Sequence, residues 1–230
     1  MRLQTIATGS KGNCYILTDD SGESLILDVG VKSAEIKKAL NFDFSKVSGV
    51  LCTHAHKDHS LSMPEMEMLG LDVFTPFLVD GGRDKRTLGK YAVQSFDVPH
   101  DGEPCVGFYI RHINGFKMLY LTDLEYCKYN FRKQEVDAIL IECNWQKDYV
   151  DDLAANYRHK VLGHLSLENC IEFIKANMTD NLKAVVLCHM SGYTMDLNMC
   201  LDEIRQVVGE NVKVSSAGKG KVIELAVARG

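Results

Sequence analysis

The first third of the chain alternates apolar and polar residues in short segments, separated by polar turns that contain glycine. This pattern predicts strands at Leu3–Ala7, Cys14–Leu17 and Ser24–Asp28 that pair as consecutive hairpins. Apolar residues at helical spacing then predict a helix at Lys32–Leu40, and the apolar run Val47–Cys52 predicts another strand. A histidine-rich segment therefore begins at the C-terminal end of a predicted strand.

The rest of the chain continues to alternate strand and helix patterns. Apolar runs predict strands at Ala92–Val98, Val106–Ile113, Lys117–Leu121, Ala138–Ile141, Ala184–Cys188 and Val222–Ala226. Helical spacing predicts helices at Leu61–Leu69, Asp148–Arg158, Leu167–Ala176 and Asp196–Val208. Two groups of strands, each followed by helices, indicate two packed sheets flanked by helices, with a site built from loops on one edge. No repeat or linker-like composition divides the sequence, so we expect one domain over residues 1–230.

The composition is that of a globular protein, with 46% hydrophobic and 25% charged residues. No apolar run approaches the roughly 20 residues that a membrane span needs, and Met1–Thr5 does not begin a signal peptide. The eight cysteines form no C-x-x-C pair and lie mostly in apolar runs, as expected of buried thiols in a reducing compartment. We therefore expect a cytoplasmic protein with no membrane partner.

The formal net charge of −5 is unlike that of proteins that coat nucleic acid, which usually carry a basic surface. This figure treats metal ligands as if no ion were bound. Two divalent ions would add about four positive charges at the point where a phosphate binds. The net charge therefore does not exclude a nucleic-acid substrate.

The histidine-rich segment, Thr53–His59, holds four potential metal ligands within six residues. Side chains alternate along extended backbone, so the first two histidines can point the same way while the following turn directs Asp58 and His59 to a second point. Imidazole and carboxylate groups suit Zn²⁺, Mn²⁺ or Fe, and two such ions about 3.5 to 4 Å apart can share a hydroxide nucleophile. Further candidate ligands lie at predicted strand ends: His100, Asp123 and His189.

The succession H-x-H-x-D-H, then His, then Asp, then His resembles the metallo-β-lactamase superfamily, over a stretch from the N-terminal hairpins to His189. The resemblance implies an α/β fold, the αββα four-layer sandwich of two mixed sheets flanked by helices, and an enzyme with a dinuclear site on one edge. It implies that one metal is bound by His54, His56 and His100, a second by Asp58, His59 and His189, and that Asp123 bridges them. Asp rather than Cys at the bridging position is unlike true zinc β-lactamases and similar to the phosphodiesterase and glyoxalase branches.

The segment Leu162–Asn169 resembles the element in RNase Z-like phosphodiesterases whose histidine faces the scissile phosphate. The resemblance implies that His164 holds or protonates the departing oxygen and that Asp58 helps to activate the hydroxide. The alternative is a capping loop, in which Ser166 caps the next helix and the histidine is a surface residue. We favour cleavage of nucleic acid or of a small phosphodiester. A glyoxalase II-like or lactonase-like ester hydrolase and a non-catalytic metal or nucleotide sensor remain alternatives.

Several short segments resemble a narrower group, the YycJ-like small metal-dependent hydrolases, which are often described as exonucleases. These segments are Thr8–Cys14, Ile141–Asn144, Gly163–Ser166 and His189–Ser191. In the first of them, two glycines, at positions 9 and 12, would allow the loop to approach a ligand or the metal loop closely. Only 40 residues, 60–99, separate the histidine-rich segment from His100, which leaves no room for the inserted domain of larger nucleases of the superfamily.

Two further features allow a functional and a structural interpretation. Glu142, just beyond a strand, either hydrogen-bonds a metal-bound histidine or is an ordinary strand-end carboxylate. A basic cluster either contacts a phosphate backbone or is a solvated face; its members are Arg83, Lys85, Arg86 and Lys90. We treat His112 and His159 as surface or strand histidines without a chemical role.

Overall fold

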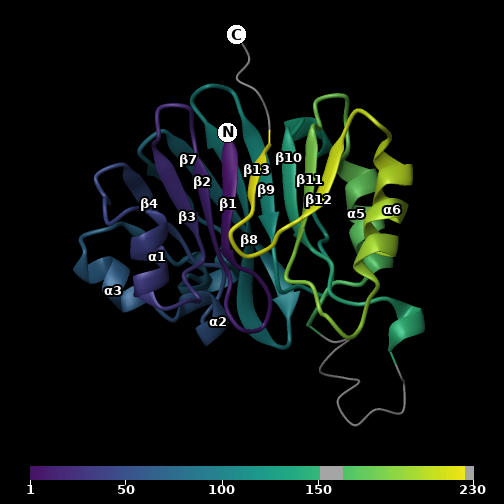
Figure 1. The fold of residues 1–230 in the computed structure, drawn as a ribbon, viewed down its shortest axis with the longest axis horizontal. Helices are drawn as coiled ribbons and strands as arrows, with labels where there is room; N and C mark the ends of the chain where they lie inside the picture. Colours follow the sequence, from purple (N-terminus) through teal and green to yellow (C-terminus); the bar gives the residue numbers. More distant parts are fainter. Residues whose placement is uncertain (151–162, 226–230) are drawn as a thin grey trace.

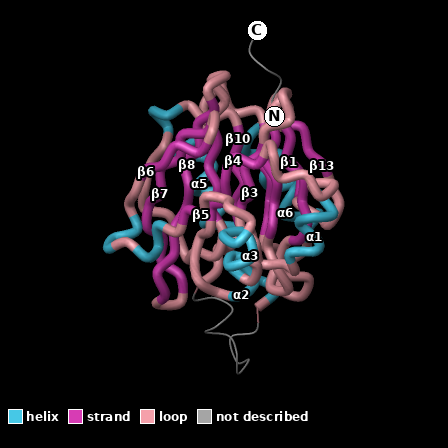
Figure 2. Tube along the Cα trace, turned by 90° about the vertical axis from the view of Figure 1, so that its left-hand side faces the viewer, coloured by secondary structure: helices cyan, strands magenta, loops and turns pink. Residues whose placement is uncertain are grey.

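Two β-sheets face each other between two layers of helices (Figure 1, Figure 2). The computed structural model describes residues 1–150 and 163–225. The six-stranded sheet has the order β13-β1-β2-β3-β4-β5, and the seven-stranded sheet has the order β12-β11-β10-β9-β8-β7-β6. Helices α1 (Ser33–Ala39) and α3 (Met63–Met68) lie beside the first sheet, and α5 (Leu167–Asn177) and α6 (Leu197–Val208) beside the second. The predicted αββα sandwich is confirmed.

The first sheet begins with the two hairpins expected from the sequence. Its antiparallel strands are β1 (Arg2–Ala7), β2 (Cys14–Thr18) and β3 (Ser24–Leu27), and β1 also pairs with β13 (Val222–Glu224). After the crossover through α1, β4 (Val47–Leu51) joins β3 in parallel, and β5 (Val73–Phe74) follows it. Parallel pairing places the C-terminal ends of β3 and β4 at the same edge of the sheet.

The second sheet is antiparallel in its first half and parallel in its second. The antiparallel strands are β6 (Lys85–Leu88), β7 (Tyr91–His100), β8 (Glu103–His112) and β9 (Lys117–Leu121). The strands β10 (Ala138–Glu142), β11 (Ala184–Cys188) and β12 (Lys213–Ser216) continue in parallel from β9. The residues that follow β9, β10 and β11 therefore emerge at one edge.

Three apolar layers hold these elements together. The alternating side chains of β9 show the division: Met118 and Tyr120 belong to the core between the sheets, and Leu119 and Leu121 belong to the core under α5 and α6. Ile36 of α1 packs in a third core against the outer face of the first sheet. A strand with both faces buried reads as a continuous apolar run, which is why β9 to β11 could be predicted from composition alone.

The structure corrects several element boundaries. The helix predicted at Leu61–Leu69 is the shorter α3, which begins at Met63 with Pro64 in its first turn, and a separate short helix, α2 (Lys57–Ser60), precedes it. The strands β5, β6 and β12 were not predicted. Of the helix predicted at Asp148–Arg158, residues 148–150 lie within the described residues, where Lys147–Tyr149 forms a 3₁₀ turn, and residues 151–158 lie outside them. His159 also lies outside the described residues. Ala226, the end of the last predicted strand, also lies outside.

Among the residues that the structure describes, no helix combines the length and the apolar character needed to cross a membrane.

Candidate metal centre

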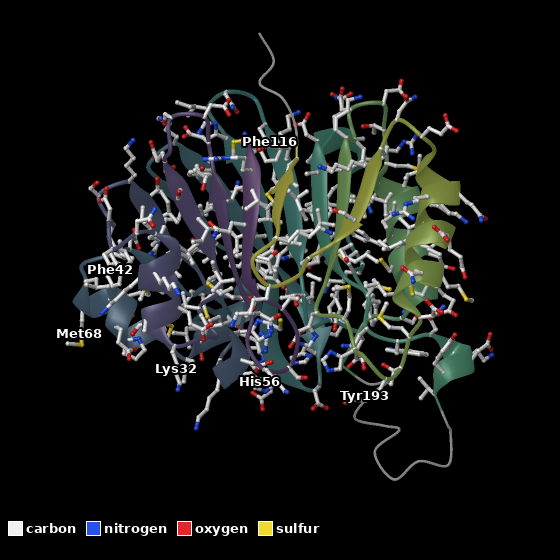
Figure 3. The ribbon with its side chains drawn as sticks, viewed as in Figure 1. Lys32, Phe42, His56, Met68, Phe116 and Tyr193 are labelled. Carbon is white, nitrogen blue, oxygen red and sulfur yellow. The ribbon has the colours of Figure 1, made fainter. Side chains whose placement is uncertain are left out.

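The predicted ligands converge on one edge of the two sheets, at the C-terminal ends of β4, β7, β9 and β11. In Figure 3, His56 lies at this edge, and the N-terminus in Figure 1 lies at the opposite one. His54, His59 and Asp123 are almost completely buried, whereas His56 is exposed. The site is therefore a cluster of polar groups, mostly buried, that reaches solvent through His56 at the edge of the sandwich; we refer to this cluster as the pit.

Among the described residues, three groups of side chains could each hold a metal ion, with the potential ligand atoms of each group within 4.8 Å of one another. One group is Asp123, Glu142, His164 and His189. The other two consist of predicted ligands only: His54, His56, His100 and Asp123, and Asp58, His59, Asp123 and His189. Asp123 is common to both: its Oδ2 lies 3.6 Å from His54 Nε2 and 3.2 Å from His59 Nε2. The structure thus brings all seven sequence-predicted ligands together, in the two sets that the resemblance implies.

Unsatisfied nitrogens test whether this donor set fits a pair of metal ions. The Nε2 atoms of His54 and His189 are buried and have no hydrogen-bond partner in the described part of the chain. A buried polar atom without a partner is costly, so such atoms mark the position of a ligand. One of them belongs to each group, and each group combines imidazole with carboxylate, the donors that divalent transition metals accept. The donor set therefore fits divalent metal binding.

The electrostatics of the pit favour cation binding. Burial lowers the pKa of His54, as do the neighbouring histidines, and burial also lowers the pKa of His100. Burial alone would raise the pKa of Asp123, but His189 and His59 hold it well below its ordinary value. His54 and His100 therefore offer neutral imidazoles to an ion, and the shared carboxylate is ionised.

Asp28 orients His59 from behind and was not identified in the sequence. This fully buried carboxylate lies directly after β3, and its Oδ2 is 2.7 Å from His59 Nδ1. Its Oδ1 accepts a hydrogen bond from the backbone N–H of Thr53, and its Oδ2 accepts one from the hydroxyl of Tyr120. The contact directs Nε2 of His59 towards Asp123. The sequence signal that could have identified Asp28 was a single carboxylate at the end of a predicted strand, followed by Val29 and Gly30.

The glycine-rich turn after β1 supports the loop that carries Asp58. The backbone N–H of Asn13 donates to the carbonyl oxygen of Asp58 at 2.7 Å. A Cβ at Gly30 would lie 1.6 Å from that same oxygen, and a Cβ at Gly12 would lie 2.5 Å from the carbonyl oxygen of Gly30. Only glycine fits at these two positions. The expected close approach of the turn is confirmed at Gly12, which packs on Gly30, and Gly30 in turn packs on the loop that carries Asp58.

Glu142 connects His164 to the metal pit. Its buried Oε1 lies 2.8 Å from His164 Nδ1 and 3.0 Å from His189 Nδ1, and its Oε2 accepts hydrogen bonds from the backbone N–H groups of Leu124 and Leu165. The ring of His164 stacks on that of His189, with centroids 5.2 Å apart. Because Nδ1 faces the carboxylate, Nε2 is the nitrogen left for a substrate. The contact between Glu142 and His189, a predicted ligand, matches the hydrogen bond that was one of the two interpretations of Glu142 in the sequence.

Backbone strain is concentrated around the site. Asp28, Asp123 and His189 have φ values of 57°, 49° and 46°, in the left-handed region that non-glycine residues rarely adopt. Each follows a strand directly or after one residue and turns its side chain towards the pit. Strain of this kind costs about 1 to 3 kcal/mol per residue and occurs most often at functional sites.

The structure favours the structural interpretation of the predicted basic cluster. Arg83 pairs with Asp97, Arg86 pairs with Asp72, and Lys90 pairs with both Asp19 and Glu23. Three of its four cations are therefore already neutralised by carboxylates. His112 is the last residue of β8 and is buried, which matches the strand rather than the surface alternative, and its Nε2 lies 3.3 Å from Asp19. The predicted N-cap is observed: Ser166 accepts a hydrogen bond from the backbone N–H of Asn169.

Comparisons with known proteins agree with this fold. A model of the metallo-beta-lactamase superfamily matches residues 7–66. The sequence is 27% identical to exodeoxyribonuclease YycJ of Bacillus anthracis, over 98% of this chain and 94% of that protein. The structure is similar to the metallo-beta-lactamase fold protein YhfI of Bacillus subtilis, with a TM-score of 0.71, 17% identity and coverage of 96% and 98% of the two chains. It is also similar to the short form of human tRNase Z, with a TM-score of 0.63, 16% identity and coverage of 99% and 100%.

At these low identities the two solved structures establish the fold, and the full-length alignment with YycJ adds a likeness in sequence. The chain therefore has the metallo-β-lactamase fold, and in sequence and fold it resembles the metal-dependent hydrolases of that superfamily.

Proposed function

We propose that the chain is a dinuclear metal-dependent phosphodiesterase that cleaves nucleic acid, with DNA exonuclease activity as the form to test first. The observation that carries the proposal is the position of His164, held by Glu142 beside a complete set of metal ligands. The curated relative is named an exodeoxyribonuclease, and one structural relative is a tRNase Z, which supports a phosphodiester substrate.

In this proposal His54, His56 and His100 would hold one ion, Asp58, His59 and His189 would hold the other, and Asp123, which belongs to both groups, would be shared. When bound, such a pair supplies Lewis-acid polarisation of phosphoryl oxygens and activation of water as the nucleophile. The chemistry suits Zn²⁺, Mn²⁺ and Fe alike.

The chain's own residues supply the remaining steps. His164 is the general acid: its Nε2 donates a proton to the departing oxygen, and Glu142 stabilises the ring through Nδ1. The side chain of His164 is 18% exposed, enough to contact a substrate while its position stays fixed. Asp58, at 25% exposure, is more accessible than Asp123 and orients the attacking water.

The test is hydrolysis of bis(p-nitrophenyl) phosphate and of end-labelled DNA and RNA after loading with Mn²⁺ or Zn²⁺. Wild type is compared with His164→Ala, and the metal content of both is measured. We expect cleavage by wild type and a loss of about 10²- to 10⁴-fold in the variant, with metal content unchanged. Equal cleavage rates in the two proteins would contradict the proposed role of His164 as the general acid.

Two other outcomes lead to the alternative functions. Hydrolysis of thioesters or lactones without any phosphodiester cleavage would identify an ester hydrolase that uses the same ligands. Tight metal binding without hydrolysis of either substrate class would identify a sensor. Either result contradicts the proposed function.

A further inference from the structure

An exposed aromatic ring lies beside the metal pit. Tyr193, in the loop that follows His189, is 92% exposed, and Figure 3 places it at the same edge of the molecule as His56. The loop is anchored on both sides of the ring: Asn144 Nδ2 donates to the His189 carbonyl, and the backbone N–H of Gln146 donates to the Thr194 carbonyl, each at 2.9 Å. A large apolar ring held in solvent by an anchored loop is suited to stacking on a planar partner.

Unpaired cations lie on the other side of the pit. Lys11, Lys32 and Lys57 are exposed, and none of them forms an ion pair within residues 1–150 and 163–225. Their three loops are in mutual contact, because the turn containing Lys11 packs on Gly30 and Gly30 packs on the carbonyl of Asp58. In Figure 3, Lys32 and Tyr193 lie on opposite sides of His56.

This arrangement differs from that of the Arg83 to Lys90 cluster, where carboxylates already neutralise most of the charge. The protein has a net charge of −5. Even so, three exposed lysines without ion pairs among the described residues lie beside the candidate metal site, and they form a local surface that attracts anions. His56 thus lies between Tyr193 and Lys32 in Figure 3, and Lys11 and Lys57 lie on loops linked to that of Lys32 through Gly30.

We propose that this edge binds single-stranded nucleic acid, with backbone phosphates on Lys11, Lys32 and Lys57 and one unstacked base on Tyr193. The inference rests on the proposed function and specifies its substrate class. Proteins that hold single strands combine these two elements, a cationic path for phosphates and aromatic rings for bases. A base within a duplex is stacked on both faces and has no face to offer to Tyr193.

The test is binding of a fluorescein-labelled oligonucleotide, about 12 nucleotides long, measured by fluorescence anisotropy on EDTA-treated protein. We expect Tyr193→Ala to weaken binding about tenfold, and Tyr193→Phe, which keeps the ring, to bind like wild type. Phe42→Ala is the matched control, because Phe42 is 73% exposed but lies beside α1, away from His56. Its affinity should equal that of wild type.

The lysines are tested through salt dependence. Lys11→Gln and Lys32→Gln should each reduce the slope of log K against log salt concentration by about 0.7, the value for one phosphate contact on a single strand. Lys175→Gln, on the exposed face of α5, should leave the slope unchanged. Wild-type affinity in Tyr193→Ala, an unchanged slope in both site-edge lysine variants, or equally tight binding of a duplex would overturn the inference.

The two proposals fail separately. Bis(p-nitrophenyl) phosphate has no nucleobase and no neighbouring phosphate, so its cleavage by metal-loaded wild type tests the proposed function alone. Oligonucleotide binding by metal-free protein requires no catalysis and tests the single-strand surface alone.

Discussion

Two buried carboxylates at opposite edges of the sandwich, Asp19 and Asp123, have opposite surroundings. Asp19 follows β2 at the edge away from the pit and accepts hydrogen bonds from the backbone N–H groups of Ser21 and Glu23, from the Ser21 hydroxyl, and from Lys90 at 3.2 Å. Asp123 instead faces histidine rings, and the Nε2 atoms of His54 and His189 have no hydrogen-bond partner in the described residues. The first carboxylate is satisfied by hydrogen bonds from the chain, whereas the second lies among imidazoles whose buried nitrogens are left without one.

The largest expected effect comes from removing the shared carboxylate. Asp123→Ala should lose both metal ions and reduce phosphodiester cleavage by about 10³-fold or more, because both groups of ligands contain this residue. Metal content by mass spectrometry and hydrolysis of bis(p-nitrophenyl) phosphate are the measurements. Asp19→Ala is the matched control and should retain two ions. Two tightly bound ions in Asp123→Ala would disprove the bridging assignment.

Glu142→Gln should have the next largest effect. The amide accepts hydrogen bonds through only one of its two terminal atoms, so either the two histidines at Oε1 or the backbone N–H groups of Leu124 and Leu165 at Oε2 lose their acceptor. We expect a loss of about 10- to 100-fold in metal affinity or cleavage rate, with the fold retained. A loss of metal affinity in a titration measures the effect on His189. A lower cleavage rate at saturating metal measures the effect on His164. Glu23→Gln, at the opposite edge, should change neither quantity.

The smallest expected effect is on stability at low pH. Burial alone would raise the pKa of Asp19, but hydrogen bonds from Ser21 and Glu23 and the charge of Lys90 lower it to about 2. As the pH falls, the unfolded state binds this proton first, near pH 4, and the folded state binds it near pH 2. About 2 kcal/mol of stability is therefore present above about pH 4 and disappears by about pH 2.

Urea unfolding of metal-free protein between pH 5 and pH 2 measures this loss. Lys90→Met should reduce the pH dependence in this window, since it removes the ion pair at the far edge. An identical pH dependence in wild type and variant would show that the Asp19 network does not contribute to stability as described.

The sequence predicts best what depends on residues that are close together in the chain. The strands β9 and β11 have the predicted boundaries, because each is a short apolar run buried on both faces. By contrast, β6 reads Lys-Arg-Thr-Leu and is mostly exposed, so no apolar pattern marks it. Edge strands of this kind are defined by pairing with a neighbour, and a single sequence does not contain that information.

The same division holds for the candidate site. The motif Thr53–His59 and the order of the later ligands predict the two groups of ligands that the structure brings together. Asp28, which contacts His59 across 31 positions, carries no motif and was missed. The Arg83 to Lys90 cluster looked like a phosphate surface only because its carboxylate partners come from other strands and loops. Contacts between distant segments therefore decide what a local pattern of charges means.

The most direct test of the central claim is a titration of metal-free protein with Mn²⁺, following bound metal and cleavage of bis(p-nitrophenyl) phosphate in the same samples. We expect cleavage to be absent without metal, to increase as ions bind, and to reach its maximum at two ions per chain. Full cleavage without metal, or a maximum at one ion per chain, would contradict a dinuclear centre organised around Asp123.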